Sequence, residues 1–258
     1  MVNLQSVMSK EIAQDSFSED FLLGGRVLIC QPTQGYRVAI DPIFLAASIV
    51  VEPGDSVLDI GAGVGAASLC LATRVPDVRV TGVELQREYV RYAADNAKLN
   101  QLRNRVEILH GDLLRPPPRL AAGTFSHVMT NPPYLAATRN NISPNENKAA
   151  ANLEGEADFD QWARFCLLMV KPKGSVTFIH RADRLDQILA FFAGKLGNIT
   201  IYPLWPGKNK PAKRVLIRGI KNTQGALRLL PGMVLHKDDG SYTPEADAIL
   251  RQACPLVM

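Results

Sequence analysis

Four polar residues follow apolar, strand-like runs in this sequence of 258 residues, and their types could serve a ligand. They are Asp59, Glu84, Asp112 and Asn131. Carboxylate and amide oxygens accept hydrogen bonds from hydroxyl and amino groups. In a parallel sheet, such strand ends lie along one crevice. We therefore expect the four side chains to line one binding site.

A glycine-rich turn, Asp-Ile-Gly-Ala-Gly-Val-Gly at residues 59–65, comes at the end of the first of these strands. Such a turn lets a ligand approach the backbone, and a helix starting at Ala66 would point unpaired N–H groups at the same place. The spacing Gly-x-Gly-x-x-Ala, with Glu84 about twenty residues on, satisfies a dinucleotide-binding pattern. The spacing Asp-x-Gly-x-Gly-x-Gly instead resembles the S-adenosylmethionine loop of class I methyltransferases. The predicted ligand contacts of this turn are Asp59, Gly61, Ala62, Gly63 and Gly65.

The acidic strand ends have distinct expected roles. The Glu84 carboxylate can accept both hydroxyls of a ribose. Asp112 can accept from an adenine amino group while the backbone near Leu113 donates to a ring nitrogen, and Leu85 is assigned to the same site. Asp59 is expected to organise the glycine turn and to add negative potential beside a cationic cofactor.

The motif Asn-Pro-Pro-Tyr at residues 131–134 follows the fourth strand and favours amine chemistry. Two prolines cannot continue a central strand, and they fix the directions of the carbonyl groups. The side-chain carbonyl of Asn131 and the backbone carbonyl of Pro132 can hold the two hydrogens of an exocyclic NH2 group. Pro133 stiffens the turn, and Tyr134 offers a flat face on which a base can stack. A rigid turn without a ligand is the simpler alternative.

Taken together, these motifs resemble those of class I S-adenosylmethionine-dependent methyltransferases that modify planar amines: adenine N6, cytosine N4, guanine N2 or glutamine N5. Further motifs look like the tRNA1(Val) (adenine-N6)-methyltransferase family, from about Phe21 to Leu250. That resemblance implies S-adenosyl-L-methionine as cofactor and the adenine beside the anticodon as substrate. These motifs lie at residues 34–37, 41–46, 144–149, 180–185 and 239–245.

Alternation of strands and helices predicts an α/β fold. With the resemblance, we expect a Rossmann-like class I methyltransferase fold: a mostly parallel, seven-stranded sheet flanked by helices, with an N-terminal hairpin and helix extension. Residues 1–52 form this extension, which could act as a lid; residues 53–222 form the methyltransferase domain, and residues 223–258 a tail packed on it. In the extension we expect a loose start, strands at 26–31 and 36–40, an N-cap at Asp41, and cofactor contacts from Arg37 and Asp41.

The net charge of +4 is unevenly distributed, since no acidic residue lies between Asp186 and Asp238. A one-signed segment is typical of phosphate binding. We expect tRNA, through its anticodon stem-loop, to contact Lys208, Lys210, Lys213 and Arg214. Four scattered cysteines, with no metal-ligand spacing and no apolar run of about 18 residues, indicate a cytoplasmic protein without metal or membrane span.

Other functions compete with an RNA adenine methyltransferase. A protein glutamine-N5 or rRNA guanine-N2 methyltransferase would use the same Asn-Pro-Pro-Tyr chemistry. A nicotinamide-dependent oxidoreductase would use the dinucleotide pattern but leaves residues 131–134 unexplained. A non-catalytic RNA-binding module on the same fold is a further alternative. The oligomeric state stays open.

Overall fold

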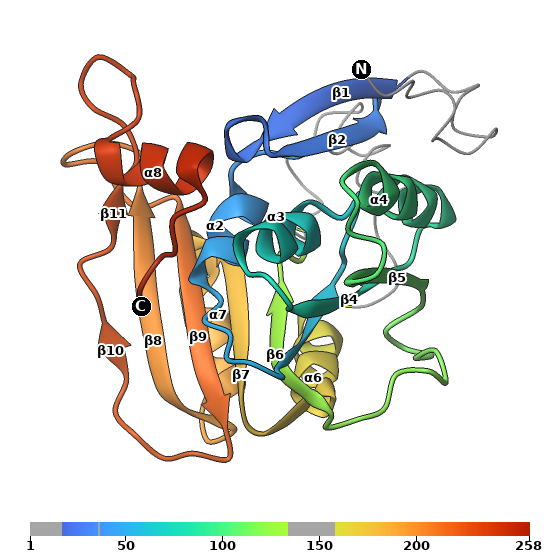
Figure 1. Cartoon of the computed structure of the whole chain (residues 1–258). Coiled ribbons are helices and arrows are strands. Elements are labelled where there is room, and N and C mark those ends of the chain that lie inside the picture. The colour runs from blue at the N-terminus through green and yellow to red at the C-terminus, as the bar shows by residue number, and fades with distance from the viewer. Residues whose placement is uncertain (1–16, 36, 134–157) are drawn as a thin grey trace, which may run out of the picture.

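One twisted sheet with helices on both faces organises the molecule (Figure 1). The computed structural model describes residues 17–35, 37–133 and 158–258. Seven long strands lie in the order β8-β9-β7-β6-β3-β4-β5, and the two-residue strands β10 and β11 pair with β8, so the sheet has nine strands. Only β9 runs antiparallel to its neighbours among the long strands. The strands are β3 Ser56–Ile60, β4 Arg79–Glu84, β5 Val106–His110, β6 Phe125–Thr130, β7 Val170–Arg181, β8 Leu196–Trp205, β9 Arg214–Lys221, β10 Arg228–Leu229 and β11 Met233–Val234.

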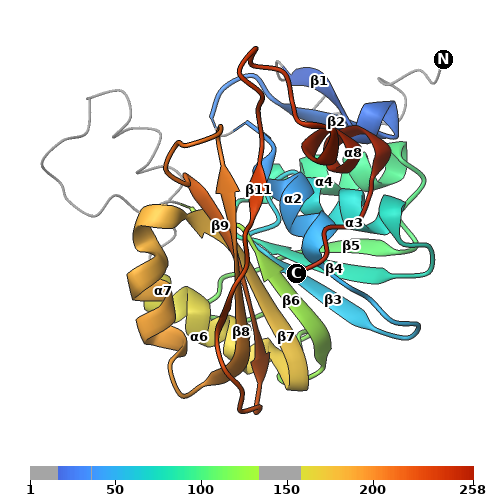
Figure 2. The same ribbon diagram turned by 90° about the vertical axis from the view of Figure 1, so that its left-hand side faces the viewer.

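The sheet divides the core into two layers, and helices cover each of them (Figure 2). Side chains of α2, α3, α4 and α8 pack in one hydrophobic cluster, and those of α6 and α7 pack in another across the sheet. The central strands are therefore covered on both faces, which is why residues 57–60 of β3 are all buried. The helices are α2 Asp41–Ser48, α3 Ala66–Arg74, α4 Arg87–Leu99, α6 Phe159–Met169, α7 Leu185–Phe192 and α8 Pro244–Gln252, with 3-10 turns η2 Leu23–Gly25 and η3 Ala182–Arg184.

The N-terminal hairpin differs from the one expected. Strand β2, Val27–Pro32, pairs antiparallel with β1, Phe17–Leu22, a segment predicted to be loose. Residues 37–40 form no strand, and residue 36 lies outside the described residues. The physical reason is that β1 is half exposed, so its sequence carries only a weak apolar alternation.

Asn96 of α4 and Asn100, the C-cap residue of that helix, bind the hairpin to the sheet domain. The Asn96 side chain accepts from the Cys30 N–H at 2.8 Å and donates to the Cys30 and Val64 carbonyls at 2.9 and 3.0 Å. One turn later, Asn100 accepts from the Leu28 N–H and donates to its carbonyl. The amides thus replace a neighbouring strand along β2. On α4 itself the polar Asn96 is buried whereas the apolar Ala94 is exposed, because Asn96 faces the hairpin.

Helix α2 begins one residue earlier than the sequence indicated. Its N-cap is Ile40, and Asp41 lies inside the first turn without capping it. The Asp41 carboxylate instead accepts from Nε of Arg214 at 2.7 Å. A charged partner 173 residues away explains why a buried aspartate occupies this position.

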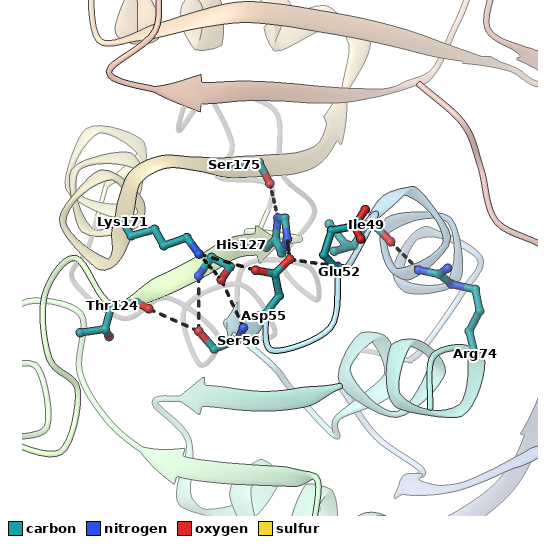
Figure 3. A network of polar contacts seen from close by, with 10 residues as sticks. Ile49, Glu52, Asp55, Ser56, Arg74, Thr124, His127, Lys171 and Ser175 are labelled. Atoms are coloured by element: carbon teal, nitrogen blue, oxygen red, sulfur yellow. Dashed lines mark hydrogen bonds and ion pairs between the residues drawn. The ribbon is translucent and has the colours of Figure 1, made fainter. Parts of the chain in front are cut away.

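The amino-terminal edge of the sheet carries a compact polar network (Figure 3). His127 of β6 lies between Ser175 of β7, at 2.7 Å from Nδ1, and Asp55, at 3.0 Å from Nε2. Lys171 reaches Asp55 at 3.5 Å. Although burial alone raises the pKa of Asp55, hydrogen bonds from Ser126, the Glu52 N–H and His127 outweigh it and hold that pKa well below its usual range. The network joins three neighbouring strands at the end opposite the predicted site.

Candidate functional site

The predicted strand ends lie on adjacent strands at the carboxyl-terminal edge of the sheet. Ile60, the last residue of β3, is paired with Val83 of β4 on one side and with Thr130 of β6 on the other. Neighbouring strands are about 4.8 Å apart. The glycine turn after Ile60, the acid Glu84 and the turn after Thr130 are therefore immediate neighbours, with Asp112 one strand further along, after β5.

The glycine turn is bonded to β4 and opens directly into α3. The N–H groups of Gly61 and Ala62 both donate to the Val83 carbonyl, at 2.8 and 3.0 Å. Gly61, Gly63 and Gly65 have φ angles of 72°, 55° and 89°, a region that favours glycine, and Gly65 is the N-cap of α3. The start of the helix thus lies directly beside the turn, as anion- and nucleotide-binding turns require.

The Asp59 carboxylate lies inside the protein rather than on the crevice surface. It is 2% exposed and accepts a 2.7 Å hydrogen bond from Ser68 of α3. Burial, opposed by the bonds from Ser68 and reinforced by the charge of Glu84, raises the pKa of Asp59 to about 6. This carboxylate holds the glycine turn against its helix and adds negative potential near neutral pH.

Glu84 connects the glycine turn with α4. Its two carboxylate oxygens accept from the Gly63 N–H at 2.9 Å and from the Gln86 N–H at 2.8 Å. Burial raises the pKa of this carboxyl, although these bonds oppose the shift. Each oxygen keeps a lone pair for a further donor, so the carboxylate can still take two ribose hydroxyls. Leu85, next to it, leaves 38% of its surface exposed and offers an apolar face to a planar ring.

Asp112 and Leu113 lie beside Glu84 because the Gly111 N–H donates to the Glu84 carbonyl at 2.9 Å. Asp112 accepts from the Leu114 N–H at 2.9 Å and is near Arg115, at 3.8 Å. Its side chain is half-buried, as is Leu113. An acceptor and a backbone donor at adjacent positions match the edge of an adenine ring.

Asn131 is half-buried directly after β6, followed by buried Pro132 and exposed Pro133. Tyr134 lies outside the described residues. Trp162 of α6 was not among the predicted site residues, yet its indole Nε1 donates to Thr130 Oγ1 at 2.8 Å, beside Asn131. Because this hydrogen bond joins residues 32 positions apart, the sequence around Trp162 gives no signal for it.

Arg37 and Asp41, both predicted to contact the cofactor, are bound within the fold. Arg37 donates to Asp20 of β1 at 2.7 Å, so it ties the segment after β2 to the hairpin. Asp41 is paired with Arg214, one of the four predicted RNA contacts. This ion pair joins α2 to the start of β9.

The other three predicted RNA contacts are exposed on one loop. We call residues 206–213, between β8 and β9, the basic loop, which carries Lys208, Lys210 and Lys213. Because Arg214 is paired with Arg181 at the end of β7, the basic loop lies at the same edge of the sheet as Asn131. Two other cations between Asp186 and Asp238 hydrogen-bond to backbone carbonyls of the fold. Arg218 donates to the Met258 carbonyl, and Lys221 donates to the Leu167 and Val170 carbonyls.

Neither a metal site nor a membrane span is found among residues 17–35, 37–133 and 158–258. No group of three or more His, Cys, Asp or Glu side chains is arranged to hold a metal ion there. Likewise, none of the described helices is long and apolar enough to cross a membrane.

Comparison with known proteins gives consistent matches. The family model "Methyltransferase small domain" matches residues 40–152. A tRNA1(Val) (adenine(37)-N6)-methyltransferase of Aeromonas hydrophila is 30% identical over 213 residues, which cover 80% of this chain and 85% of that protein. An rRNA N(6)-adenosine-methyltransferase of Caenorhabditis elegans is 31% identical over 137 residues, 53% of this chain and 56% of that protein.

A solved structure shares the fold. The crystal structure of a predicted O-methyltransferase from Agrobacterium tumefaciens superimposes with a TM-score of 0.70 at 22% identity, covering 84% of this chain and 99% of that one. At this identity the likeness concerns the fold alone. It matches the α/β architecture expected from the alternation of strands and helices.

Proposed function

The chain belongs to the tRNA1(Val) (adenine(37)-N6)-methyltransferase family, and from this premise we propose that it methylates the exocyclic amine of an anticodon-loop adenine in tRNA. It is an S-adenosylmethionine-dependent methyltransferase. What we propose beyond this is the acceptor of the methyl group. A protein of this kind would act in the cytoplasm, where its tRNA substrate is found.

The observation that carries the proposal is the pairing of Ile60 with Thr130. It places the glycine turn and the Asn131 turn side by side, and a transfer between a donor and an amine needs these two turns to be neighbours. The dinucleotide alternative uses only the first turn and gives the second no role. The pairing therefore favours methyl transfer to an amine.

The residues of the chain supply positioning and charge stabilisation. The cofactor supplies a methyl group on a sulfonium, which needs no metal. Glu84 and the glycine turn would hold the nucleoside part, and Asn131 and Pro132 would accept the two hydrogens of the target amine. These carbonyl acceptors favour the pyramidal nitrogen of the transition state, whose lone pair is no longer delocalised into the ring. No base need act before attack, because the alkylated nitrogen becomes acidic.

The basic loop supports an RNA acceptor. Its three exposed lysines lie at the edge that carries Asn131, where phosphates flanking a target nucleotide would pass. The base must leave its stack to reach the site, which costs less in a loop than in a duplex. The nematode relative named for rRNA makes an rRNA adenine the second candidate acceptor.

Nucleoside mass spectrometry tests this function. The protein is incubated with S-adenosylmethionine and either bulk tRNA or rRNA, and the digest is searched for N6-methyladenosine. We expect it in tRNA, and we expect Asn131→Ala to lower turnover by about 100-fold or more while cofactor binding survives. Asn104→Ala, at an exposed turn, is the control. Methylation of rRNA alone, or of guanine N2, would replace the proposed acceptor.

A further inference from the structure

A single hydroxyl group joins the two turns of the site. Thr130 Oγ1 donates to the Ile60 carbonyl at 2.8 Å and accepts from the indole Nε1 of Trp162 at 2.8 Å. Thr130 is fully buried. Ile60 directly precedes the glycine turn, and Thr130 directly precedes Asn131. The hydroxyl therefore lies at the last point where the two strands can be held together before their turns diverge.

The indole ring makes a second contact with the glycine turn. A Cβ added at Gly61 would lie 2.8 and 2.9 Å from Cζ2 and Cη2 of Trp162, closer than real side chains approach. The ring thus packs directly on the backbone of the turn. One side chain of α6 touches both sides of the site: the donor turn through its ring and the acceptor strand through its N–H.

The strand ladder cannot do this work beyond Thr130. Pro132 and Pro133 have no N–H, so the backbone after Asn131 cannot continue the hydrogen bonds to β3. Without another connection, the separation of the two turns would depend on loop packing alone. The side chains of Thr130 and Trp162 provide that connection from the buried side.

We infer that Thr130 and Trp162 are positioning residues that fix the separation and angle between the methyl-donor turn and the amine-acceptor turn. Neither touches a reacting atom. In-line transfer needs the reacting atoms about 3–3.5 Å apart and aligned, and a shift of about 1 Å can cost 100-fold in rate. This inference rests on the proposed function, because it concerns the same transfer.

Two substitutions of Thr130 separate positioning from packing. Thr130→Val keeps the shape but removes the hydroxyl, whereas Thr130→Ser keeps the hydroxyl and removes a buried methyl group. We expect kcat for tRNA methylation to fall at least about tenfold in Thr130→Val and to stay within about threefold in Thr130→Ser. The Kd for S-adenosylmethionine, measured by calorimetry, should stay within about twofold in both. Trp162→Phe, which keeps a ring but no N–H, should lower kcat as Thr130→Val does.

Two outcomes overturn the inference: an unchanged kcat in Thr130→Val, or equal losses in both variants that follow their loss of thermal stability. Failure of the proposed function is seen separately, as a wild-type protein that methylates no tRNA. In that case, a fluorescence measurement without RNA tests the positioning role. In a Trp205→Phe background, the fluorescence change of Trp162 on adding S-adenosylmethionine should persist in Thr130→Ser and be altered in Thr130→Val. The same change in all three proteins overturns the positioning role.

Discussion

Replacement of Glu84 by glutamine tests the proposed cofactor geometry most directly. In the structure, each carboxylate oxygen accepts one backbone N–H, from Gly63 and from Gln86. In glutamine one of the two positions becomes an NH2 group, which cannot accept. Whichever way the amide turns, one backbone N–H and one ribose hydroxyl lose their acceptor.

These two losses affect different measurements. The backbone N–H is unpaired in the free and the bound protein alike, so that loss lowers stability but not affinity. The hydroxyl loses its acceptor only on binding. A hydrogen bond to a charged group contributes about 1.5–3 kcal/mol, so the Kd for S-adenosylmethionine should rise about 10- to 150-fold. The change in stability should be small, because removing a buried charge offsets the lost N–H bond.

Calorimetry with S-adenosylmethionine measures the effect. The matched control is Glu88→Gln, which changes an exposed acid in the first turn of α4, the helix that follows Glu84. The pH dependence gives a second signature. Because burial raises the pKa of Glu84, affinity in the wild type should weaken as the pH falls through that raised pKa, and Glu84→Gln should show a smaller pH dependence, since only Asp59 still titrates at the site. A Kd within about twofold of wild type would refute the assignment of Glu84 to the ribose.

Two further predictions concern RNA binding and stability. Alanine at the three lysines of the basic loop should weaken tRNA binding and reduce by about 2 the slope of log K against log[salt]. The control replaces three exposed cations at the opposite edge of the sheet, Arg79, Lys98 and Lys173, and should leave both unchanged. An unchanged slope in the basic-loop variant would place the RNA elsewhere. Asp55→Asn should lower the free energy of unfolding at pH 7 by about 1–3 kcal/mol, because a charged acceptor is lost. Because the pKa of Asp55 is lowered in the folded protein, the difference in unfolding free energy between wild type and variant should be present above about pH 4 and shrink below it. Denaturant unfolding at several pH values measures this difference, and a constant difference would contradict the reasoning.

The parallel core was predictable from sequence because its strands are buried on both faces and end in polar residues. Residues 57–60 are all buried, residues 126–130 are buried except for the half-buried His127, and the two segments form neighbouring strands. The capping box of α6 is also a local feature, since Asp158 and Gln161 are only three residues apart and each side chain accepts from the backbone N–H of the other. Local chemistry decided all these elements.

What the sequence did not reveal depends on contacts between distant segments. Asp41 before a proline is typical of an N-cap, and nothing nearby indicates that Arg214 takes its carboxylate. The strand at 17–22 is half exposed, so its pairing with β2 left almost no apolar signal. Charge composition likewise could not separate the exposed lysines of the basic loop from Lys221, whose ammonium group is used inside the fold.

The network of Asp55, His127 and Ser175 has a consequence for the evolution of this sequence. It ties together three neighbouring strands in the amino-terminal half of the sheet, while the candidate site lies at their carboxyl ends. On the proposed function, we therefore expect mutations in the basic loop or after Asn131 to alter acceptor binding without removing the bonds that anchor the sheet. With the proposed acceptor, we expect relatives of this chain to differ in their nucleic-acid targets more readily than in their cofactor or their reaction.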